Sequence, residues 1–148
     1  MREELDGRLC DEYPSIFRDR HKSPQETAMC WGFPGDGWFA IIDELCAKLQ
    51  LLESVGVFPI AVQVKEKTGT LRFYCRLEYD QRWNEQQQLL WRGIVSDCCH
   101  SAEFQSGSTC EECGKPGSRR QGRATGVQTL CDDCGKIQTK LGKGDTEE

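Results

Sequence analysis

Two Cys-x-x-Cys-Gly pairs in the last third of the chain limit what it can fold into more than any other feature. The four cysteines of these pairs, in chain order, are Cys110, Cys113, Cys131 and Cys134. Two residues between paired cysteines let a tight turn direct both thiolates at one ion, and this spacing is typical of four-cysteine zinc sites. The pattern predicts a zinc ribbon over residues 106–137, in which these side chains hold Zn²⁺.

The segment between the pairs has too few apolar side chains to fold unaided, since it holds Val127, Leu130 and little more. Ordering it costs roughly 1.5 kcal/mol per residue, whereas structural zinc contributes on the order of 10–16 kcal/mol in small peptides. We expect Gly114 and Gly135, which follow the two pairs, to turn the chain with a positive φ. Because four thiolates leave no open coordination position, the predicted metal has a structural role.

The chain has ten cysteines, and their interpretation depends on the cellular compartment. The first residues, MREELDGRL, are charged and unlike a signal peptide, and no apolar run reaches the roughly 18 residues of a membrane helix. We therefore expect a cytoplasmic protein without membrane contact, in which clustered cysteines favour metal over disulfides. Cys98, Cys99 and His100 could form a second metal site. The alternative is that Cys98 packs in the core while His100 lies near a helix end, where a positive charge is favourable.

Residues 1–105 predict an α+β body in which helices pack on a β-hairpin. Helices are expected over residues of about 23–31, 37–54 and 80–100, and residues 138–148 are expected to form a flexible tail. The expected N-terminal caps are Ser23 with Glu26, Asp36, and Asp80. The second helix has apolar residues three and four apart, at Trp38, Ile41, Ile42, Leu45, Leu49 and Leu52. The inward stripe of the third is expected to be Trp83, Gln87, Leu90, Trp91, Ile94, Val95 and Cys98.

Residues of about 60–77 predict the hairpin, with its turn in the stretch KTGT. Pairing Glu66 with Leu71 places three apolar pairs on one face of the two strands. These pairs are Val64 with Phe73, Val62 with Cys75, and Ile60 with Leu77. Because a slip of one residue would separate the pairs, the pattern itself supports this register.

The charge of the chain is unevenly distributed. The net charge is −5, but residues 114–130 contain no acid, and their four cations are Lys115, Arg119, Arg120 and Arg123. A polyanion would be repelled by the body and attracted by this loop. The loop therefore indicates either a nucleic-acid contact or a solvated basic loop.

Aromatic residues gather around the stretch GFPGDG, at Trp31, Phe33, Trp38 and Phe39. Core packing is the ordinary explanation for such residues. The alternative is an exposed aromatic patch that binds a partner protein, a common form of interaction hot spot.

Evidence for an enzyme is weaker. His21 and Cys30 are candidates for a base and a nucleophile, but no motif accompanies them. Asp36, Asp43 and Glu44 lie near one predicted helix start, where a cap and a polar helix face explain them.

Three ordered motifs resemble small phage- and prophage-encoded proteins of uncharacterised function. They are YPSIFRDRH with ETAMCWGFPGDGWFAIIDELC, then VQVKEKTGTLRFY, then CEECGKPG with VQTLCDDC, and they extend from Tyr13 to Cys134. The resemblance implies a phage origin and action in the cytosol of a bacterial host, and it implies no reaction.

These observations predict a non-enzymatic zinc-ribbon protein that binds and modulates or inhibits a protein complex of the bacterial host or phage, such as defence or nucleic-acid machinery. A nucleic-acid-binding regulator that acts through the basic loop is the first alternative, and an enzyme is the second.

Overall fold

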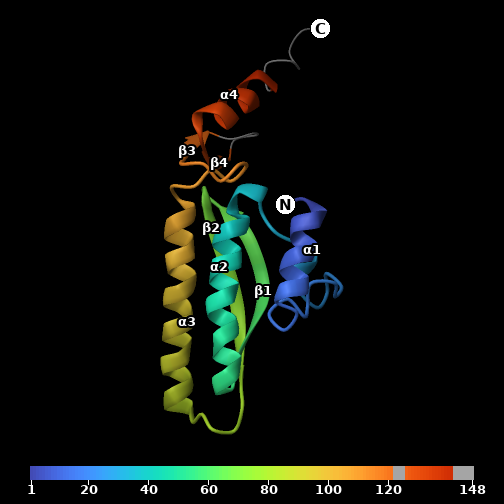
Figure 1. Cartoon of the computed structure of the whole chain (residues 1–148), viewed down its shortest axis with the longest axis vertical. Coiled ribbons are helices and arrows are strands. Elements are labelled where there is room, and N and C mark those ends of the chain that lie inside the picture. The colour runs from blue at the N-terminus through green and yellow to red at the C-terminus, as the bar shows by residue number, and fades with distance from the viewer. Residues whose placement is uncertain (122–125, 142–148) are drawn as a thin grey trace.

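The structure is a computed structural model that describes residues 1–121 and 126–141. Two long antiparallel strands, β1 (Val57–Lys67) and β2 (Thr70–Tyr79), form a hairpin against which α2 (Phe39–Gln50) and α3 (Glu85–Ser106) pack. A second, smaller hairpin and α4 (Asp132–Leu141) lie at one end of this body (Figure 1). The short strands are β3 (Ser118–Gln121) and β4 (Val127–Leu130). The predicted α+β fold with a C-terminal four-cysteine unit is confirmed.

The first helix, α1 (Glu3–Glu12), was not predicted from the sequence. Its only fully buried residue is Leu9, which is too little for a clear apolar stripe. The acids in its first turn suit the positive end of the helix dipole. Just after the helix, the Tyr13 hydroxyl donates to the Asp43 carboxylate at 2.7 Å, which ties this segment to α2.

A helix over 23–31 was predicted, and this prediction is wrong. Ser23 and Glu26 make the expected capping contact, with the Ser23 N–H donating to Glu26 Oε2 at 3.1 Å. The chain then forms only a turn and a short 3₁₀ helix, Ala28–Trp31. Met29 is the one buried residue of that segment, so no apolar face stabilises further turns.

The predicted helix over 37–54 is present as α2 with a 3₁₀ turn at each end, Asp36–Trp38 and Leu51–Val55. Its predicted stripe is confirmed for Ile41, Ile42, Leu45 and Leu49, all of which are buried. Asp36 does not cap it. The Asp36 carboxylate instead accepts from the backbone N–H of Arg2 at 2.6 Å and so fixes the start of the chain.

The hairpin register was predicted correctly near the turn and wrongly farther away. The pairs from Glu66–Leu71 to Gln63–Tyr74 are as expected. A bulge at Val62 then shifts the register, so that Cys75 pairs with Ala61 and Leu77 with Pro59, instead of Val62 and Ile60. An extra residue in one strand is the usual form of such a bulge, and local sequence pattern does not reveal it.

The third predicted helix starts and ends later than expected. Asn84, not Asp80, caps α3, because its side chain accepts from Gln87 N at 3.0 Å and Gln87 bonds back to Asn84 N. The helix continues to Ser106. Its predicted inward stripe is wrong at Leu90 and Ile94, which are 70% and 47% exposed, whereas Val95, Ala102 and Ser106 are buried.

Two further expectations concern the ends of elements and membrane contact. The helix α4 extends to Leu141, so part of the expected tail of 138–148 is helical, and residues 142–148 lie outside the described residues. Within the part of the chain that the structure describes, no helix has the length and apolar character needed to span a bilayer.

Candidate metal centre

The two cysteine pairs come from different kinds of local structure. Cys110 and Cys113 lie on the turn that follows α3, while Cys131 immediately precedes α4 and Cys134 is in its first turn. Pairing of Ser118 with Leu130 across β3 and β4 brings the turn and the helix start together. The small hairpin therefore acts as the spacer that joins the two halves of the site.

All four thiol sulfurs lie within 4.8 Å of one another, and the Sγ atoms of Cys113 and Cys131 are 3.6 Å apart. In a tetrahedral site with zinc–sulfur bonds of about 2.3 Å, neighbouring sulfurs are about 3.8 Å apart. The arrangement fits such a site, and these four residues could hold a metal ion. Cys110 is fully buried and Cys113 is exposed, so the site lies at the surface of the fold.

The first pair forms the tight turn that its spacing predicts. The backbone N–H of Cys110 donates to Lys115 O at 2.7 Å, and that of Gly114 donates to Cys110 O at 2.9 Å. Gly114 has a φ of 78°, a conformation that costs glycine little. The expectation for Gly114 is confirmed.

The second pair differs from the prediction. Gly135 is not among the glycines with positive φ. Its N–H donates to Cys131 O at 3.0 Å as part of the first turn of α4. The thiolates at this pair are thus oriented by a helix start, where free N–H groups and the helix dipole favour negative charge.

This helix start affects the titration of the thiols. The backbone N–H of Cys134 donates to Cys131 Sγ at 3.5 Å, and this contact lowers the pKa of the Cys131 thiol to about 7. Burial raises the pKa of the Cys134 thiol. Four thiolates this close repel one another, and a bound divalent cation removes that repulsion and deprotonates its ligands.

A glycine-rich loop of the body is pressed against the first cysteine turn. The Gly37 N–H donates to Glu111 O at 2.7 Å. A Cβ placed on Gly37 would lie 2.0 Å from Cys110 O, and one on Gly35 would lie 2.4 Å from Glu111 O. The glycines of the stretch GFPGDG permit this backbone-to-backbone approach. We call residues 35–38 the glycine clamp.

Two side chains extend the contact between body and C-terminal unit, which we define as residues 108–121 and 126–141. The indole N–H of Trp38 donates to Thr109 O at 2.8 Å. On the other side, the buried Thr129 hydroxyl donates to Gly69 O, in the turn between β1 and β2, at 2.6 Å. The C-terminal unit is therefore bound to both the glycine clamp and the hairpin turn.

The predicted aromatic partner-binding patch is not a single exposed surface. Trp38 is fully buried and Phe33 is buried, with its ring 5.0 Å from that of Phe17. Phe39 is partly buried beneath the Arg8 guanidinium. Only Trp31 is strongly exposed, at 76%. The interpretation of Phe33 and Trp38 as exposed contact residues is wrong, because they belong to the core.

The predicted basic loop is partly neutralised in three dimensions. The Arg120 guanidinium pairs with Asp132, and the Lys115 ammonium lies 3.9 Å from Asp133, both acids being at the start of α4. Arg119 is exposed, and Arg123 lies outside the described residues. The nucleic-acid alternative stays a prediction, with fewer uncompensated cations than the sequence suggested.

The other candidate groups do not assemble into a site. Within residues 1–121 and 126–141, the four C-terminal cysteines are the one group with three or more candidate metal ligands together. Cys98, Cys99 and His100 thus form no second cluster there. Cys99 instead lines the same hollow as Cys75 of β2, and the neighbouring Cys75 thiol together with burial raises the pKa of Cys99. His21 is exposed and Cys30 is partly buried.

The three acids near the start of α2 also have structural roles. Asp36 binds the N-terminal backbone, Asp43 accepts from Tyr13, and Glu44 pairs with Lys48 at 2.9 Å.

No matching family model, curated protein or solved structure was found for this chain.

Proposed function

We propose that the protein is a zinc-stabilised binding protein, in which Cys110, Cys113, Cys131 and Cys134 hold one structural Zn²⁺. The observation that carries this proposal is the gathering of four sulfurs within 4.8 Å. Sulfur ligands in a tetrahedral arrangement favour zinc or an iron–sulfur cluster. One cysteine pair lies on a turn and the other at a helix start, and together they match the ordinary four-cysteine zinc site in ligand type and spacing.

Zinc would supply charge neutralisation and the fixed tetrahedral geometry that four thiolates require. The chain's own groups prepare that geometry. The start of α4 orients Cys131 and Cys134, the glycine clamp holds the Cys110 turn, and Thr129 anchors β4 to the hairpin turn. With four protein ligands no coordination position is left for substrate, which supports a structural role over a catalytic one.

The function we propose for this assembly is protein binding, with a protein complex of a bacterial host or phage as the partner. Support comes from exposed large apolar side chains, a class that includes the Trp and Phe residues enriched in protein–protein contact surfaces. Phe104 is 85% exposed and Leu90 is 70% exposed, both on α3, and Trp31 is 76% exposed. The expected consequence of binding is modulation or inhibition of that complex.

The test combines metal analysis with partner capture. The purified full chain should contain one zinc per molecule by elemental analysis, and iron should be absent. Immobilised chain should retain a stoichiometric protein partner from bacterial lysate treated with nuclease. Trp31→Ala and Phe104→Ala variants, which keep the core intact, should weaken that retention.

Two results would contradict the proposal separately. Iron with visible charge-transfer absorption would exclude the zinc assignment while leaving the binding function open. Retention of nucleic acid alone, lost on nuclease treatment, would exclude protein binding and favour the basic-loop alternative.

A further inference from the structure

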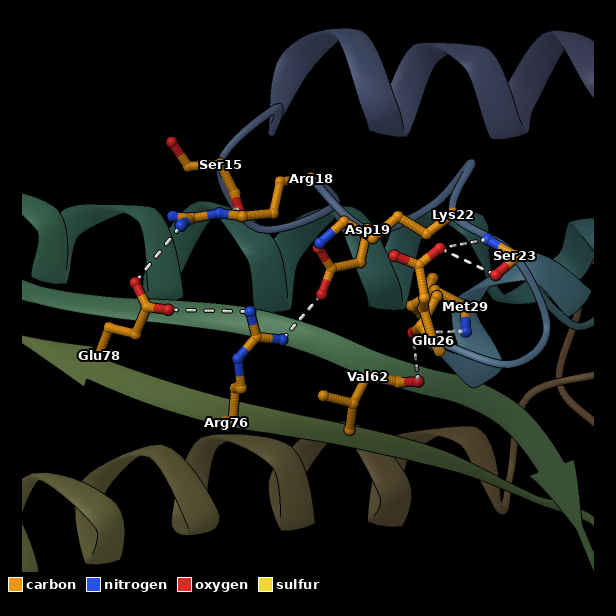
Figure 2. A network of polar contacts seen from close by, with 11 residues as sticks. Ser15, Arg18, Asp19, Lys22, Ser23, Glu26, Met29, Val62, Arg76 and Glu78 are labelled. Carbon is orange, nitrogen blue, oxygen red and sulfur yellow. Dashed lines mark hydrogen bonds and ion pairs between the residues drawn. The ribbon is translucent and has the colours of Figure 1, made fainter.

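The two outer edges of the main hairpin, along β1 and along β2, are covered by other segments to different extents. Residues 13–27 run alongside β1, where Ala61 N donates to Ile16 O at 2.8 Å and Thr27 reaches Val62 O at 3.5 Å. Figure 2 shows this segment against the strands, with Asp19 contacting Arg76 and Arg18 contacting Glu78. The edge of β1 is therefore covered, as exposed strand edges usually are.

The outer edge of β2 is covered at one end only. The Leu71 N–H points away from β1 and donates to Ser106 Oγ of α3 at 2.8 Å. Because backbone groups alternate in direction along a strand, the N–H and C=O groups of Phe73, Cys75 and Leu77 also point outward. Among the described residues these groups have no hydrogen-bond partner outside the hairpin. They form a row of free donors and acceptors beside α3.

This row opens into a groove of about 530 Å³ between β2 and α3. We call it the edge groove, formed by residues 72–77 of β2 and by Arg92, Val95, Cys99, His100 and Glu103 of α3. Arg92 and Glu103 are about 17 Å apart along the helix axis at 1.5 Å per residue. That length suits about five residues of extended peptide at 3.3 Å each.

The charges of the groove favour an acidic occupant. Arg92 and His100 have no ion-pair partner among the described residues, whereas Glu103, the one acid of the groove, already pairs with Arg72. A second hollow shares His100 and Glu103 with the first and leads to Arg119 of β3, which also lacks an ion-pair partner in the described chain. Two uncompensated arginines, Arg92 and Arg119, thus flank His100 in a chain whose net charge is −5.

We propose that the edge groove binds an extended acidic segment of a partner protein, which adds as a third strand along β2. Its backbone bonds to the outward groups of Phe73, Cys75 and Leu77, and its acidic side chains pair with Arg92 and Arg119. Strand addition at an open edge gives affinity through the main chain and specificity through alternate side chains. This inference rests on the protein-binding function proposed above. A nucleic acid would match the cations but not the spaced row of N–H and C=O groups.

The test uses peptides selected from a displayed library of random twelve-residue sequences on the zinc-loaded full chain. Selected peptides are expected to carry acids at alternate positions. Each peptide is labelled with a fluorophore, and its dissociation constant is measured by anisotropy. N-methylation of every second amide, on the side facing β2, should weaken binding at least tenfold, and N-methylation of the intervening amides should not.

Charge-reversal variants separate this groove from other surfaces. Arg92→Glu should weaken binding of the acidic peptide at least tenfold, and a peptide with arginine in place of the facing acid should bind this variant better than the parent. Arg18→Glu on the covered side makes the same charge change and should alter affinity less than twofold.

Three results would overturn the inference. They are failure to select any peptide, tolerance of N-methylation at every position, and equal affinity of the Arg92→Glu and parent chains. If a protein partner is captured from lysate by Arg92→Glu as well as by the parent, protein binding stands and the edge groove is excluded. Salt-sensitive binding of a labelled oligothymidylate that is lost in Arg92→Glu, without peptide binding, would assign the groove to single-stranded nucleic acid instead.

Discussion

The body and the C-terminal unit are stabilised by different kinds of contact. The body has a continuous apolar core, in which Leu9, Trp38, Ile42 and Leu49 are completely buried. The buried cluster of the C-terminal unit consists of Cys110, Leu130 and Cys131, with Cys134 packed against it. Since so small an apolar cluster cannot offset the entropy of ordering the chain, this unit depends on its ligand set and on docking to the body.

The largest expected effect comes from removing the metal. Chelation, or Cys113→Ser, should unfold the C-terminal unit and leave the body folded, because zinc binding contributes on the order of 10 kcal/mol to small four-ligand units. Amide resonances of residues 108–121 and 126–141 should collapse toward random-coil positions in a ¹H–¹⁵N spectrum, while those of α2, β1 and β2 keep their dispersion.

Cys75→Ser is the matched control for this experiment. It removes a thiol from β2 without touching the metal set and should keep one zinc per chain. Retention of stoichiometric zinc by Cys113→Ser would contradict the ligand assignment. Loss of the body resonances on chelation would show that the two regions fold as one unit.

The second prediction concerns the glycine clamp. Gly37→Ala should destabilise the docked unit by about 3 kcal/mol, in the range of overpacked cores, because its Cβ would lie 2.0 Å from Cys110 O and 2.5 Å from Gly114 N. Both neighbours are backbone atoms and cannot rotate away. The measurement is zinc release to a competing chelator, which should become faster and more complete.

Gly93→Ala provides the control for that substitution. Gly93 lies within α3, and nothing lies within 4 Å of its added Cβ. Alanine should therefore stabilise the helix by about 0.5–1 kcal/mol and leave zinc release unchanged. Equal zinc release from Gly37→Ala and the parent chain would remove the clamp from the account.

Local patterns predicted the parts of the fold that short segments determine. The stripe of α2 was readable because its regular spacing persists over about three turns. The turn of the main hairpin was readable because Gly69 permits a φ of 84°. The cysteine pairs were readable for the same reason, since two-residue spacing is itself a geometric constraint.

The remaining features depend on contacts between distant residues. The local sequence predicted Asp36 as a helix cap, yet its carboxylate accepts from the backbone N–H of Arg2, 34 residues earlier in the chain. The bulge at Val62 and the approach of Gly37 to Cys110 likewise require tertiary partners. For the aromatics of GFPGDG, burial was the ordinary explanation, and the exposed-patch alternative failed at Phe33 and Trp38 because the clamp draws that loop into the core.

A third prediction separates docking from core packing. Trp38→Phe should cost about 2 kcal/mol, since it leaves Thr109 O without the indole donor and reduces the volume of a fully buried side chain. Trp83→Phe is the comparison, because its indole N–H donates to Val55 O at 2.8 Å within the body. Both should lower the melting temperature, but only Trp38→Phe should speed zinc release. If both substitutions speed zinc release equally, the Trp38 contact has no effect on zinc release beyond its contribution to general stability.

The smallest expected effect tests a polar contact that belongs to the body alone. The Asp19 carboxylate is buried and accepts from Arg76 at 2.8 Å. This hydrogen bond, followed by the contact with Lys22, lowers the pKa of Asp19 below its usual value. The exposed Glu78 lies 3.8 Å from the same arginine, so the two carboxylates form a natural pair for comparison.

Asp19→Asn should lower the free energy of unfolding at pH 7 by about 1.5 kcal/mol, as expected for a charge-assisted hydrogen bond. Because the pKa of Asp19 is depressed in the folded state, its stabilising contribution is present above the unfolded value of about 3.9 and is lost as pH falls through the folded pKa. The difference between Asp19→Asn and the parent, measured by urea unfolding, should therefore shrink below about pH 4.

Glu78→Gln should change stability little, since exposed ion pairs contribute about 0–1 kcal/mol. Zinc content should be unaffected by either substitution at pH 7, because neither carboxylate contacts the C-terminal unit. A constant difference from pH 7 to pH 3 would mean that Asp19 stabilises the body through packing and that its charge makes no contribution.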